Sequence, residues 1–178
     1  MAKNVYKTRE HANILRQADI FYDLTQPQLE KIATFCTELK PKAGETIFEE
    51  NSAGDEMYVV ASGEVEILVN PALIRARDAT QPTRPLTIAT IRRGQTFGEI
   101  ALVDQGLRSA SARCISKKAH LLVIPRNQLI RLCDSDPDLG YRLMRNISAD
   151  LAFRIRGTDL TIREYLRWHP RDNKPKRF

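Results

Sequence analysis

The residues with the clearest chemical potential lie between positions 97 and 109 of the sequence. The run Phe97-Gly98-Glu99-Ile100-Ala101-Leu102 places a glycine and a carboxylate at the start of an apolar stretch, and Arg108 and Ser109 follow it. A glycine lets the backbone approach an anion, and the first amides of a helix are free to bind one. An arginine adds a fork of charged donors and a serine adds a hydroxyl. This combination predicts a cradle for a phosphate group.

The carboxylate of Glu99 needs a separate role in such a cradle, because it repels phosphate. We expect it to accept a hydrogen bond from a hydroxyl, such as the 2′-hydroxyl of a ribose. A structural interpretation competes with this one: Gly98 would permit a tight bend, and Glu99 would cap exposed amides or form an ion pair with Arg108. The position of Arg108, nine residues after Glu99 and within a β-rich pattern, favours binding.

The elements that must position these residues are short β-rich runs between Ala43 and Pro125. They are separated by glycines or polar turns, and they comprise Thr46–Phe48, Met57–Val60, Val65–Val69, Leu86–Ile91, Ser109–Ile115 and Leu121–Ile124. Many short strands at this spacing predict a β-sandwich or jelly-roll barrel. In the third run Val65, Ile67 and Val69 alternate with other residues, which predicts one interior face. The proline-containing segment between Asn70 and Pro85 is expected to be a long hairpin connection.

Helical patterns flank the β-rich region. At the N-terminal side the helical spacing extends from Ile14 to Phe21, and Thr25 with Gln28 resembles a capping box before a second short helix. This second helix has an apolar stripe suited to packing, formed by Leu29, Ile32, Ala33 and Cys36.

At the C-terminal side Asn127 is expected to cap a short helix to Leu132, and Pro137 to open a longer one. The longer helix carries a stripe at steps of four, made of Leu139, Leu143, Ile147, Leu151 and Ile155. Such a stripe covers the barrel or meets a partner helix in a homodimer, and the sequence leaves both open. Gly157 is expected to end the helix, and Thr158 to cap a final one that Pro170 terminates.

The predicted fold class is therefore mainly β with flanking helices: a jelly-roll β-barrel with N-terminal helices and a long C-terminal helix. The expected boundaries are 1–40 for the N-terminal helical segment, 41–126 for the barrel with its phosphate-binding cassette, 127–157 for the C-terminal helices, and 158–178 for a short helix with a basic tail.

Composition limits the classes of function. The 178 residues are 42% hydrophobic and 28% charged, as expected for one globular domain. No apolar run approaches the roughly 20 residues of a membrane-spanning helix, and the polar start lacks the apolar stretch of a signal peptide, so we expect a cytoplasmic protein without membrane contact. Of the net charge of +6, most belongs to residues 154–178, with eight basic and three acidic side chains. A mobile, solvated tail is expected, and a nucleic-acid-binding arm is the minor alternative.

Metal or acid-base catalysis is not expected either. The three cysteines are far apart and predict buried thiols rather than a metal site, and no acid or serine stands beside a histidine in a catalytic motif. The histidines, His11, His120 and His169, are expected at the surface or its boundary. The cassette offers no base beside a nucleophile. We therefore expect no enzyme, no metal and no cofactor.

Several motifs in order resemble the cyclic-nucleotide-binding domain family of bacterial catabolite activators, kinase regulatory subunits and gated channels. The likeness extends roughly from Phe21 to Arg156. The motifs that carry it are Pro41-Lys42-Ala43-Gly44-Glu45-Thr46-Ile47, Gly54-Asp55-Glu56-Met57-Tyr58-Val59-Val60, Ser62-Gly63-Glu64-Val65, the run from Gly94 to Leu102, and Arg108-Ser109-Ala110. Leu107 stands where many members have proline, which concerns loop rigidity more than charge.

The resemblance implies roles for individual residues. Glu99 would hold the ribose 2′-hydroxyl, and Arg108 would pair with the cyclic phosphate beside Ser109 and the amides of Ile100 and Ala101. Interior strand positions that would line the base pocket are Ile67 and Ile88, and the residues that would form a lid over the purine are Arg154 and Arg156. Cyclic-GMP-selective members often have threonine at the position of Ser109, so cyclic AMP is favoured over cyclic GMP.

The expected function is a cyclic-nucleotide sensor that signals through its C-terminal helices to a protein partner of unknown identity. The alternative is an interaction domain of the same fold that binds no nucleotide. Only twenty-one residues follow Gly157, too few for the helix-turn-helix domain that many members carry. The resembling activators pair through the long helix, so a homodimer is the partner arrangement to test.

Overall fold

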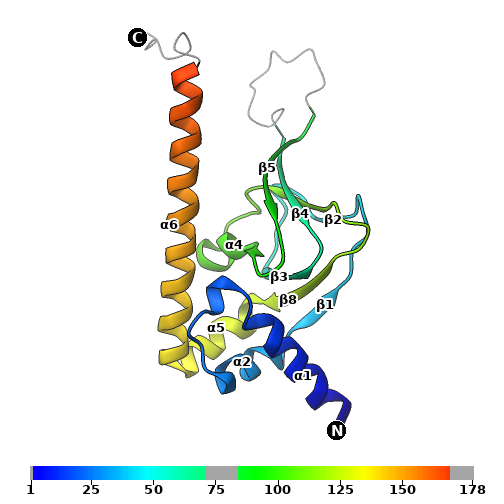
Figure 1. The fold of residues 1–178 in the computed structure, drawn as a ribbon. Coiled ribbons are helices and arrows are strands. Elements are labelled where there is room, and N and C mark those ends of the chain that lie inside the picture. Colours follow the sequence, from blue (N-terminus) through cyan, green and yellow to red (C-terminus); the bar gives the residue numbers. More distant parts are fainter. Residues whose placement is uncertain (1, 71–83, 169–178) are drawn as a thin grey trace.

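The computed structural model describes residues 2–70 and 84–168 of the chain. Its eight strands form two four-stranded antiparallel sheets with the orders β1-β8-β3-β6 and β2-β7-β4-β5. Helices gather at one end of this barrel, and one long helix passes along its side (Figure 1). The predicted jelly-roll barrel with flanking helices is confirmed.

The strands agree closely with the β-rich runs of the sequence. Their bounds are β1 Thr37–Leu39, β2 Thr46–Phe48, β3 Glu56–Ser62, β4 Val65–Val69, β5 Leu86–Ile91, β6 Thr96–Phe97, β7 Ser111–Cys114 and β8 His120–Pro125. The three-residue strand β1 and the two-residue strand β6 were not predicted, because so short a run has no measurable alternation. β1 pairs with β8, so the barrel begins before residue 41.

One irregularity between β4 and β5 lies on the β5 strand. Ile67 pairs with Ala89 and Leu68 pairs with Thr87, so Ile88 is an extra residue, as in a β-bulge. Of the predicted interior face, Val65 is buried in the barrel cluster and Ile67 packs against it. Leu68 is buried as well, which the alternation did not predict. Of the predicted connection between Asn70 and Pro85, residues 71–83 lie outside the described part.

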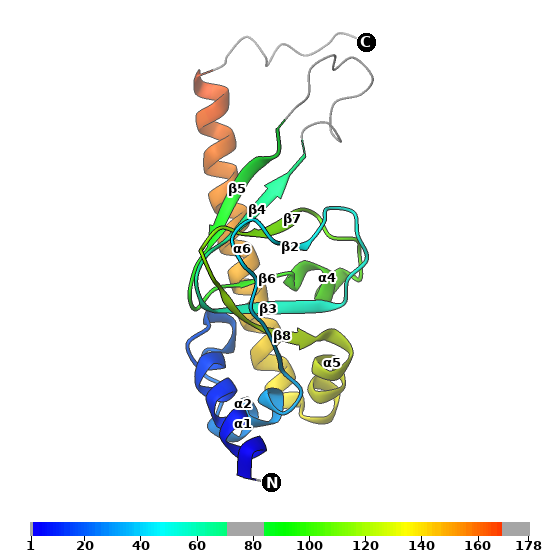
Figure 2. The same cartoon turned by 90° about the vertical axis from the view of Figure 1, so that its right-hand side faces the viewer.

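The helices α1 Ala2–Leu15, α2 Gln26–Ala33 and α5 Arg126–Ser135 cover one end of the barrel (Figure 2). The first helix ends at Leu15, and the chain continues through the 3-10 turn η1 Asp19–Phe21, so the predicted single helix to Phe21 is wrong. The capping box is confirmed, with the Thr25 hydroxyl accepting from the Gln28 amide. Helix α5 begins at Arg126, so Asn127 lies in its first turn and does not cap it.

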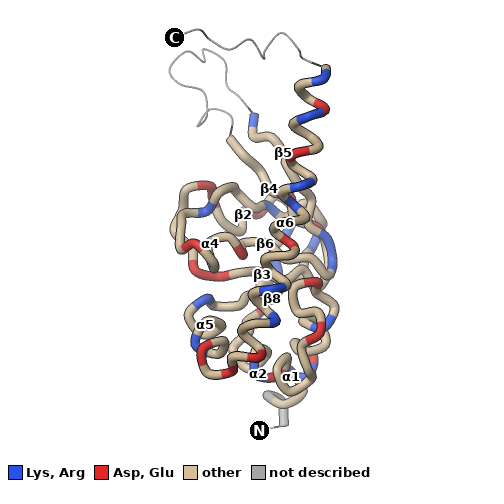
Figure 3. The backbone as a smooth tube through the Cα atoms, turned by 90° about the vertical axis from the view of Figure 1, so that its left-hand side faces the viewer, with Lys and Arg blue, Asp and Glu red and all other residues tan. Residues whose placement is uncertain are grey.

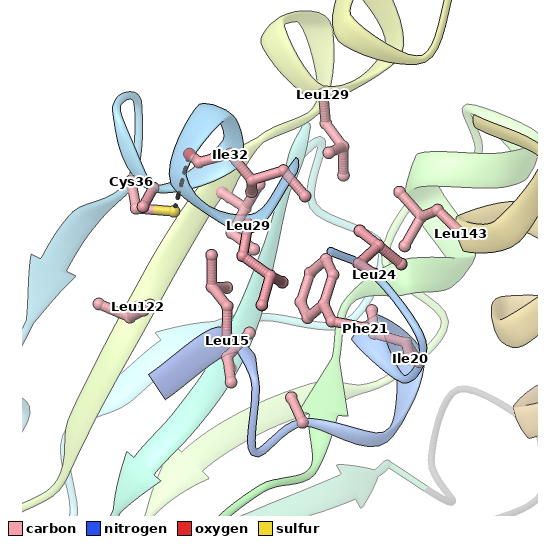
Figure 4. Packing of buried hydrophobic residues seen from close by; sticks show 14 of the residues in the cluster. Leu15, Ile20, Phe21, Leu24, Leu29, Ile32, Cys36, Leu122, Leu129 and Leu143 are labelled. Carbon is pink, nitrogen blue, oxygen red and sulfur yellow. Dashed lines mark hydrogen bonds between the residues drawn. The ribbon is translucent and has the colours of Figure 1, made fainter. Parts of the chain in front are cut away.

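The core has two parts that share strand β3. Met57 and Val59 point toward the helices, while Tyr58 and Val60 point into the barrel. Figure 4 shows the helical part, in which Leu15, Phe21 and Leu29 pack together beside β8. The two-residue period of a strand thus lets β3 hold the helices on one face and the interior of the barrel on the other.

A charged cluster attaches α1 to the barrel. Glu38 on β1 accepts hydrogen bonds from His11 at 3.1 Å and pairs with Lys40 at 2.7 Å and His120 at 3.2 Å. The bonds to Lys40 and His11 lower the pKa of Glu38 to about 2. His11 is 2% exposed, so its predicted surface position is wrong; the carboxylate partner allows this polar ring to be buried.

Helix α6 Pro137–Trp168 is continuous, and the predicted break at Gly157 is wrong. Glycine inside a helix costs only about 1 kcal/mol, which a helix of this length tolerates. The hydroxyl of Thr158 donates to the Arg154 carbonyl, as a residue inside a helix does, and therefore does not cap a new helix. The expected boundary between residues 157 and 158 falls inside this one element.

The predicted apolar stripe of α6 packs on the chain's own core. Leu139, Leu143 and Ile147 are at most 1% exposed within the helical cluster, while Ile155 is 63% exposed. The first half of α6 thus covers the core, and the second half passes beside the barrel and beyond it (Figure 1). No described helix is long and apolar enough to cross a bilayer.

Candidate functional site

The turn between β6 and the short helix α4 Glu99–Asp104 forms one wall of the site. Gly98 has a φ of 81° there, a left-handed conformation that glycine adopts without strain. A Cβ atom at this position would lie 2.8 Å from Nη1 of Arg108 and 3.1 Å from the Glu56 carbonyl oxygen. Both the turn and the close approach of Arg108 therefore require glycine.

Arg108 is buried at the mouth of the barrel, with its side chain 2% exposed. Its Nη1 donates to the Gly98 carbonyl at 3.2 Å, and its Nη2 donates to the Glu56 carbonyl at 2.8 Å. The guanidinium lies over the Phe48 ring, 4.3 Å from the ring centre. Its Nε is buried without a hydrogen-bond partner among the described residues. A buried cation thus keeps an unused donor.

The backbone around Arg108 is held by the loop that follows β2. The Arg108 amide donates to the Ser52 carbonyl at 2.9 Å, and the Asn51 amide donates to the Arg108 carbonyl at 2.8 Å. Gly54 leaves room for the side chain, because a Cβ atom there would lie 2.5 Å from the Arg108 Nε. The loop and the cassette together therefore fix the direction of the guanidinium.

Glu99 is 2% exposed and stands at the first position of α4. One carboxylate oxygen, Oε1, accepts from Nη1 of Arg154 at 2.9 Å. The other, Oε2, is buried without a hydrogen-bond partner among the described residues. Burial raises the pKa of Glu99 above its ordinary value, while the charges of Arg154 and Arg108 act in the opposite direction. The carboxylate therefore keeps a free acceptor in a site with little water.

Arg154 connects α6 to this site. Besides pairing with Glu99, it donates through Nη2 to the Thr96 carbonyl at 2.8 Å and pairs with Asp150 at 2.9 Å. Arg154, which the sequence predicted as a lid over the purine, thus contacts the carboxylate of the cassette. Any ligand group that binds Glu99 must share this carboxylate with Arg154 or displace it.

These side chains enclose a small pocket of about 80 Å³. A volume of this size holds only a few waters, since each occupies about 30 Å³ in the liquid, and ligand pockets usually measure about 300 Å³ or more. The pocket is therefore small in this conformation. Its lining residues are Phe48, Ile67, Phe97, Gly98, Glu99, Ile100, Arg108, Ser109, Ala110 and Arg154.

Most residues singled out by the sequence meet at this pocket, and two lie elsewhere. Ala101 belongs to α4, directly after the lining residue Ile100. Ile88 is 56% exposed, as are its neighbours in the first part of β5, where Leu86 is 59% exposed. Arg156 is exposed because a step of two residues rotates it by about 200° from Arg154 around the helix. Neither of these two lines the pocket.

The aromatic wall was missed by sequence reasoning. This wall is a cluster of three rings with centres 4.9 to 5.9 Å apart, formed by Phe48, Tyr58 and Phe97. The guanidinium of Arg108 stacks on the Phe48 ring. Phe97 is the first residue of the cassette motif, so the sequence could have identified it as part of the site. The meeting of Phe48 with Arg108 depends on the pairing of β2 with β7, which local patterns do not specify.

Comparison with known proteins identifies the family. Residues 38–136, more than half of the chain, match the cyclic nucleotide-binding domain family, and the chain belongs to this family. It is similar to the cyclic AMP receptor protein of Thermus thermophilus, with 30% identity over 83% of this chain and 62% of that protein. It is also similar to isozyme 1 of the cGMP-dependent protein kinase of Drosophila melanogaster, with 27% identity over 74% of this chain and 16% of the kinase. The chain thus spans less than two thirds of either relative.

Among solved structures, a cyclic nucleotide-binding domain from Methylobacillus flagellatus has a similar fold. The TM-score is 0.72 at 21% identity, over 91% of this chain and 85% of that one. At this identity the likeness concerns the fold alone, and it agrees with the two-sheet barrel and its flanking helices.

The contact between Arg154 and Glu99 has a measurable consequence. In the variant Arg154→Gln, the pKa of Glu99 should rise further above its ordinary value, because burial remains and the nearest opposing charge is lost. The pKa can be followed by NMR of the glutamate carboxyl carbons, with Glu99→Gln used to assign the signal.

Arg156→Gln is the matched control, because it removes an exposed arginine two residues away. Its Glu99 signal should titrate as in the wild type. If Arg154→Gln also leaves the titration unchanged, α6 does not contact the cassette in solution.

Proposed function

We propose that this chain is a sensor for a cyclic nucleotide, with cyclic AMP as the preferred ligand, and that it signals to a protein partner through α6. The single observation that carries the proposal is the convergence of two buried, oppositely charged side chains on one pocket, each with an unused polar atom. Arg108 and Glu99 both line the pocket, and Nε of Arg108 and Oε2 of Glu99 are buried without a hydrogen-bond partner among the described residues.

The two groups match the two ends of a ribose cyclic phosphate. The phosphate carries a negative charge and accepts hydrogen bonds, which suits the guanidinium of Arg108 with the Ser109 hydroxyl and the amides at the start of α4. The 2′-hydroxyl of the ribose is a donor, which suits the Glu99 carboxylate. A buried polar group without a hydrogen-bond partner destabilises the protein. A ligand that supplies partners for both groups removes this penalty, which makes its binding free energy more favourable.

The mechanism of signalling follows from Arg154. Arg154 occupies Oε1 of the carboxylate whose Oε2 would accept from the ribose hydroxyl, and the pocket that Arg154 helps to line is smaller than a nucleotide needs. Ligand binding then favours arrangements in which α6 has shifted relative to the barrel. A ligand shifts such an equilibrium only by its differential affinity for the two states. The second half of α6 carries this change to the partner.

The preference for cyclic AMP rests on Ser109 at the pocket mouth. The named relatives include both a cyclic AMP receptor and a cGMP-dependent kinase, so the choice of base is part of the proposal. Cyclic GMP binding more than about tenfold tighter than cyclic AMP, a difference of about 1.4 kcal/mol, would reverse this preference.

Calorimetric titration with cyclic AMP, cyclic GMP and linear AMP tests the proposal. The wild type should bind cyclic AMP, and Arg108→Ala should weaken binding by roughly ten- to a hundredfold, because a charge-assisted contact contributes about 1.5 to 3 kcal/mol. Arg113→Ala is the control, since Arg113 pairs with Glu66 on the same barrel and does not line the pocket.

Two results would contradict the proposal. If no cyclic nucleotide binds at high micromolar concentration, the chain is an interaction domain in which the cassette only holds the fold. If Arg108→Ala binds as well as the wild type, the phosphate lies elsewhere.

The partner we propose to test first is a second copy of the chain. Beyond the buried stripe, α6 has a second series of positions at alternating steps of three and four, the spacing of a two-stranded coiled coil. This series consists of Met144, Ser148, Leu151, Ile155, Thr158, Ile162 and Tyr165. Met144 and Leu151 are partly buried, whereas Ile155 is 63% and Ile162 is 51% exposed. The seam therefore leaves the core and continues along the exposed half of the helix.

Sedimentation velocity tests this pairing with and without cyclic AMP. The wild type should sediment as a dimer, and the double variant Ile155→Glu, Ile162→Glu as a monomer, because charges at seam positions oppose pairing. Leu160→Glu is the control, since Leu160 is 60% exposed on the opposite side of α6. A wild-type monomer at tens of micromolar in both conditions would exclude the dimer.

A further inference from the structure

Glu56, the first residue of β3, lies beside the phosphate-binding arginine. Its side chain is on the same face of the strand as Tyr58, at the mouth of the barrel. One carboxylate oxygen, Oε2, is 3.6 Å from Nη2 of Arg108 and accepts from the Tyr58 hydroxyl at 3.4 Å. The main-chain oxygen of the same residue accepts from Nη2 at 2.8 Å. Glu56 therefore engages the guanidinium with both its backbone and its side chain.

The two ion-paired groups differ in their freedom to move. The Arg108 side chain is 2% exposed and held between the Phe48 ring and two carbonyl groups, whereas the Glu56 side chain is 40% exposed. Glu56 is the acid that pairs with Arg108 within the described residues. Figure 3 shows acidic residues along the chain around β3 and α4.

We propose that the Glu56 carboxylate is an internal competitor of the ligand phosphate and sets the affinity of the site. This inference rests on the proposed function. Without ligand, Glu56 balances a buried positive charge that would otherwise be costly. When the phosphate arrives, two anions face one guanidinium, and the exposed carboxylate must turn away or repel the ligand. The affinity of the site is then lower than its donors alone would give.

The ligand-free pairing is tested by a double-mutant cycle with Glu56→Gln and Arg108→Gln, followed by urea unfolding. Glu56→Gln should lower the urea midpoint in the wild-type background, because Arg108 loses its counter-charge. In the Arg108→Gln background, the same substitution should lower the urea midpoint less, or not at all. Equal shifts in the two backgrounds would show that Glu56 does not act through Arg108, and would overturn the inference.

The competition is tested by calorimetric titration of Glu56→Gln with cyclic AMP. The variant should bind at least about tenfold tighter than the wild type, because one like charge next to the phosphate is gone. Glu64→Gln is the matched control: Glu64 is 42% exposed and also pairs with an arginine, Arg92, away from the pocket. Its affinity should equal that of the wild type.

The outcomes separate the inference from the proposed function. A wild type that binds, with Glu56→Gln binding equally or more weakly, overturns the inference and leaves the proposed function intact. If neither protein binds a cyclic nucleotide, the proposed function is overturned, and the role of Glu56 as a competitor falls with it. Tighter binding by both Glu56→Gln and Glu64→Gln would point to net charge alone and would also overturn the inference.

Discussion

The burial of one positive charge, that of Arg108, is the constraint on which the rest of the site depends. A buried guanidinium is costly unless its donors and its charge are satisfied. Carbonyl groups of Gly98 and Glu56 take two donors, the Phe48 ring faces the cation, and Glu56 supplies a negative charge. Gly54 and Gly98 occupy the two positions at which a Cβ atom would collide with the Arg108 side chain. The barrel thus holds a cation at its mouth, and one donor of that cation has no hydrogen-bond partner among the described residues.

The long helix joins the site to the rest of the molecule. Its first half is part of the core through Leu139, Leu143 and Ile147, so it cannot leave without exposing that core. Its next turns bring Arg154 to Glu99, and its last turns extend beyond the barrel (Figure 1). One continuous helix therefore contacts both the core and the cassette.

The sequence predicted the fold well because its signals are local. Short β-rich runs, the Thr25 capping box and Pro137 each act within a few residues, and the structure has these elements where they were expected. The errors have two causes. Gly157 does not end α6, because the cost of one glycine is small in a helix of this length. His11 is buried because Glu38 on a different element accepts its hydrogen bond, which no local pattern shows. Within the site, the motif from Phe97 to Ser109 was visible, but Phe48 and Glu56 reach Arg108 only through the closure of the barrel. Ile88 was misplaced because the first four residues of β5 are all exposed, which their apolar character does not reveal.

The central claim is that Glu99 holds the ribose of a cyclic nucleotide whose phosphate lies on Arg108. The most direct measurement is a thermodynamic cycle by calorimetry, in which wild type and Glu99→Gln are each titrated with cyclic AMP and with 2′-deoxy cyclic AMP. The wild type should bind the deoxy analogue at least about tenfold more weakly, since a buried carboxylate is left without its hydroxyl partner. Glu99→Gln should lose most of this discrimination. Equal binding of both ligands by the wild type, or undiminished discrimination by Glu99→Gln, would contradict the account.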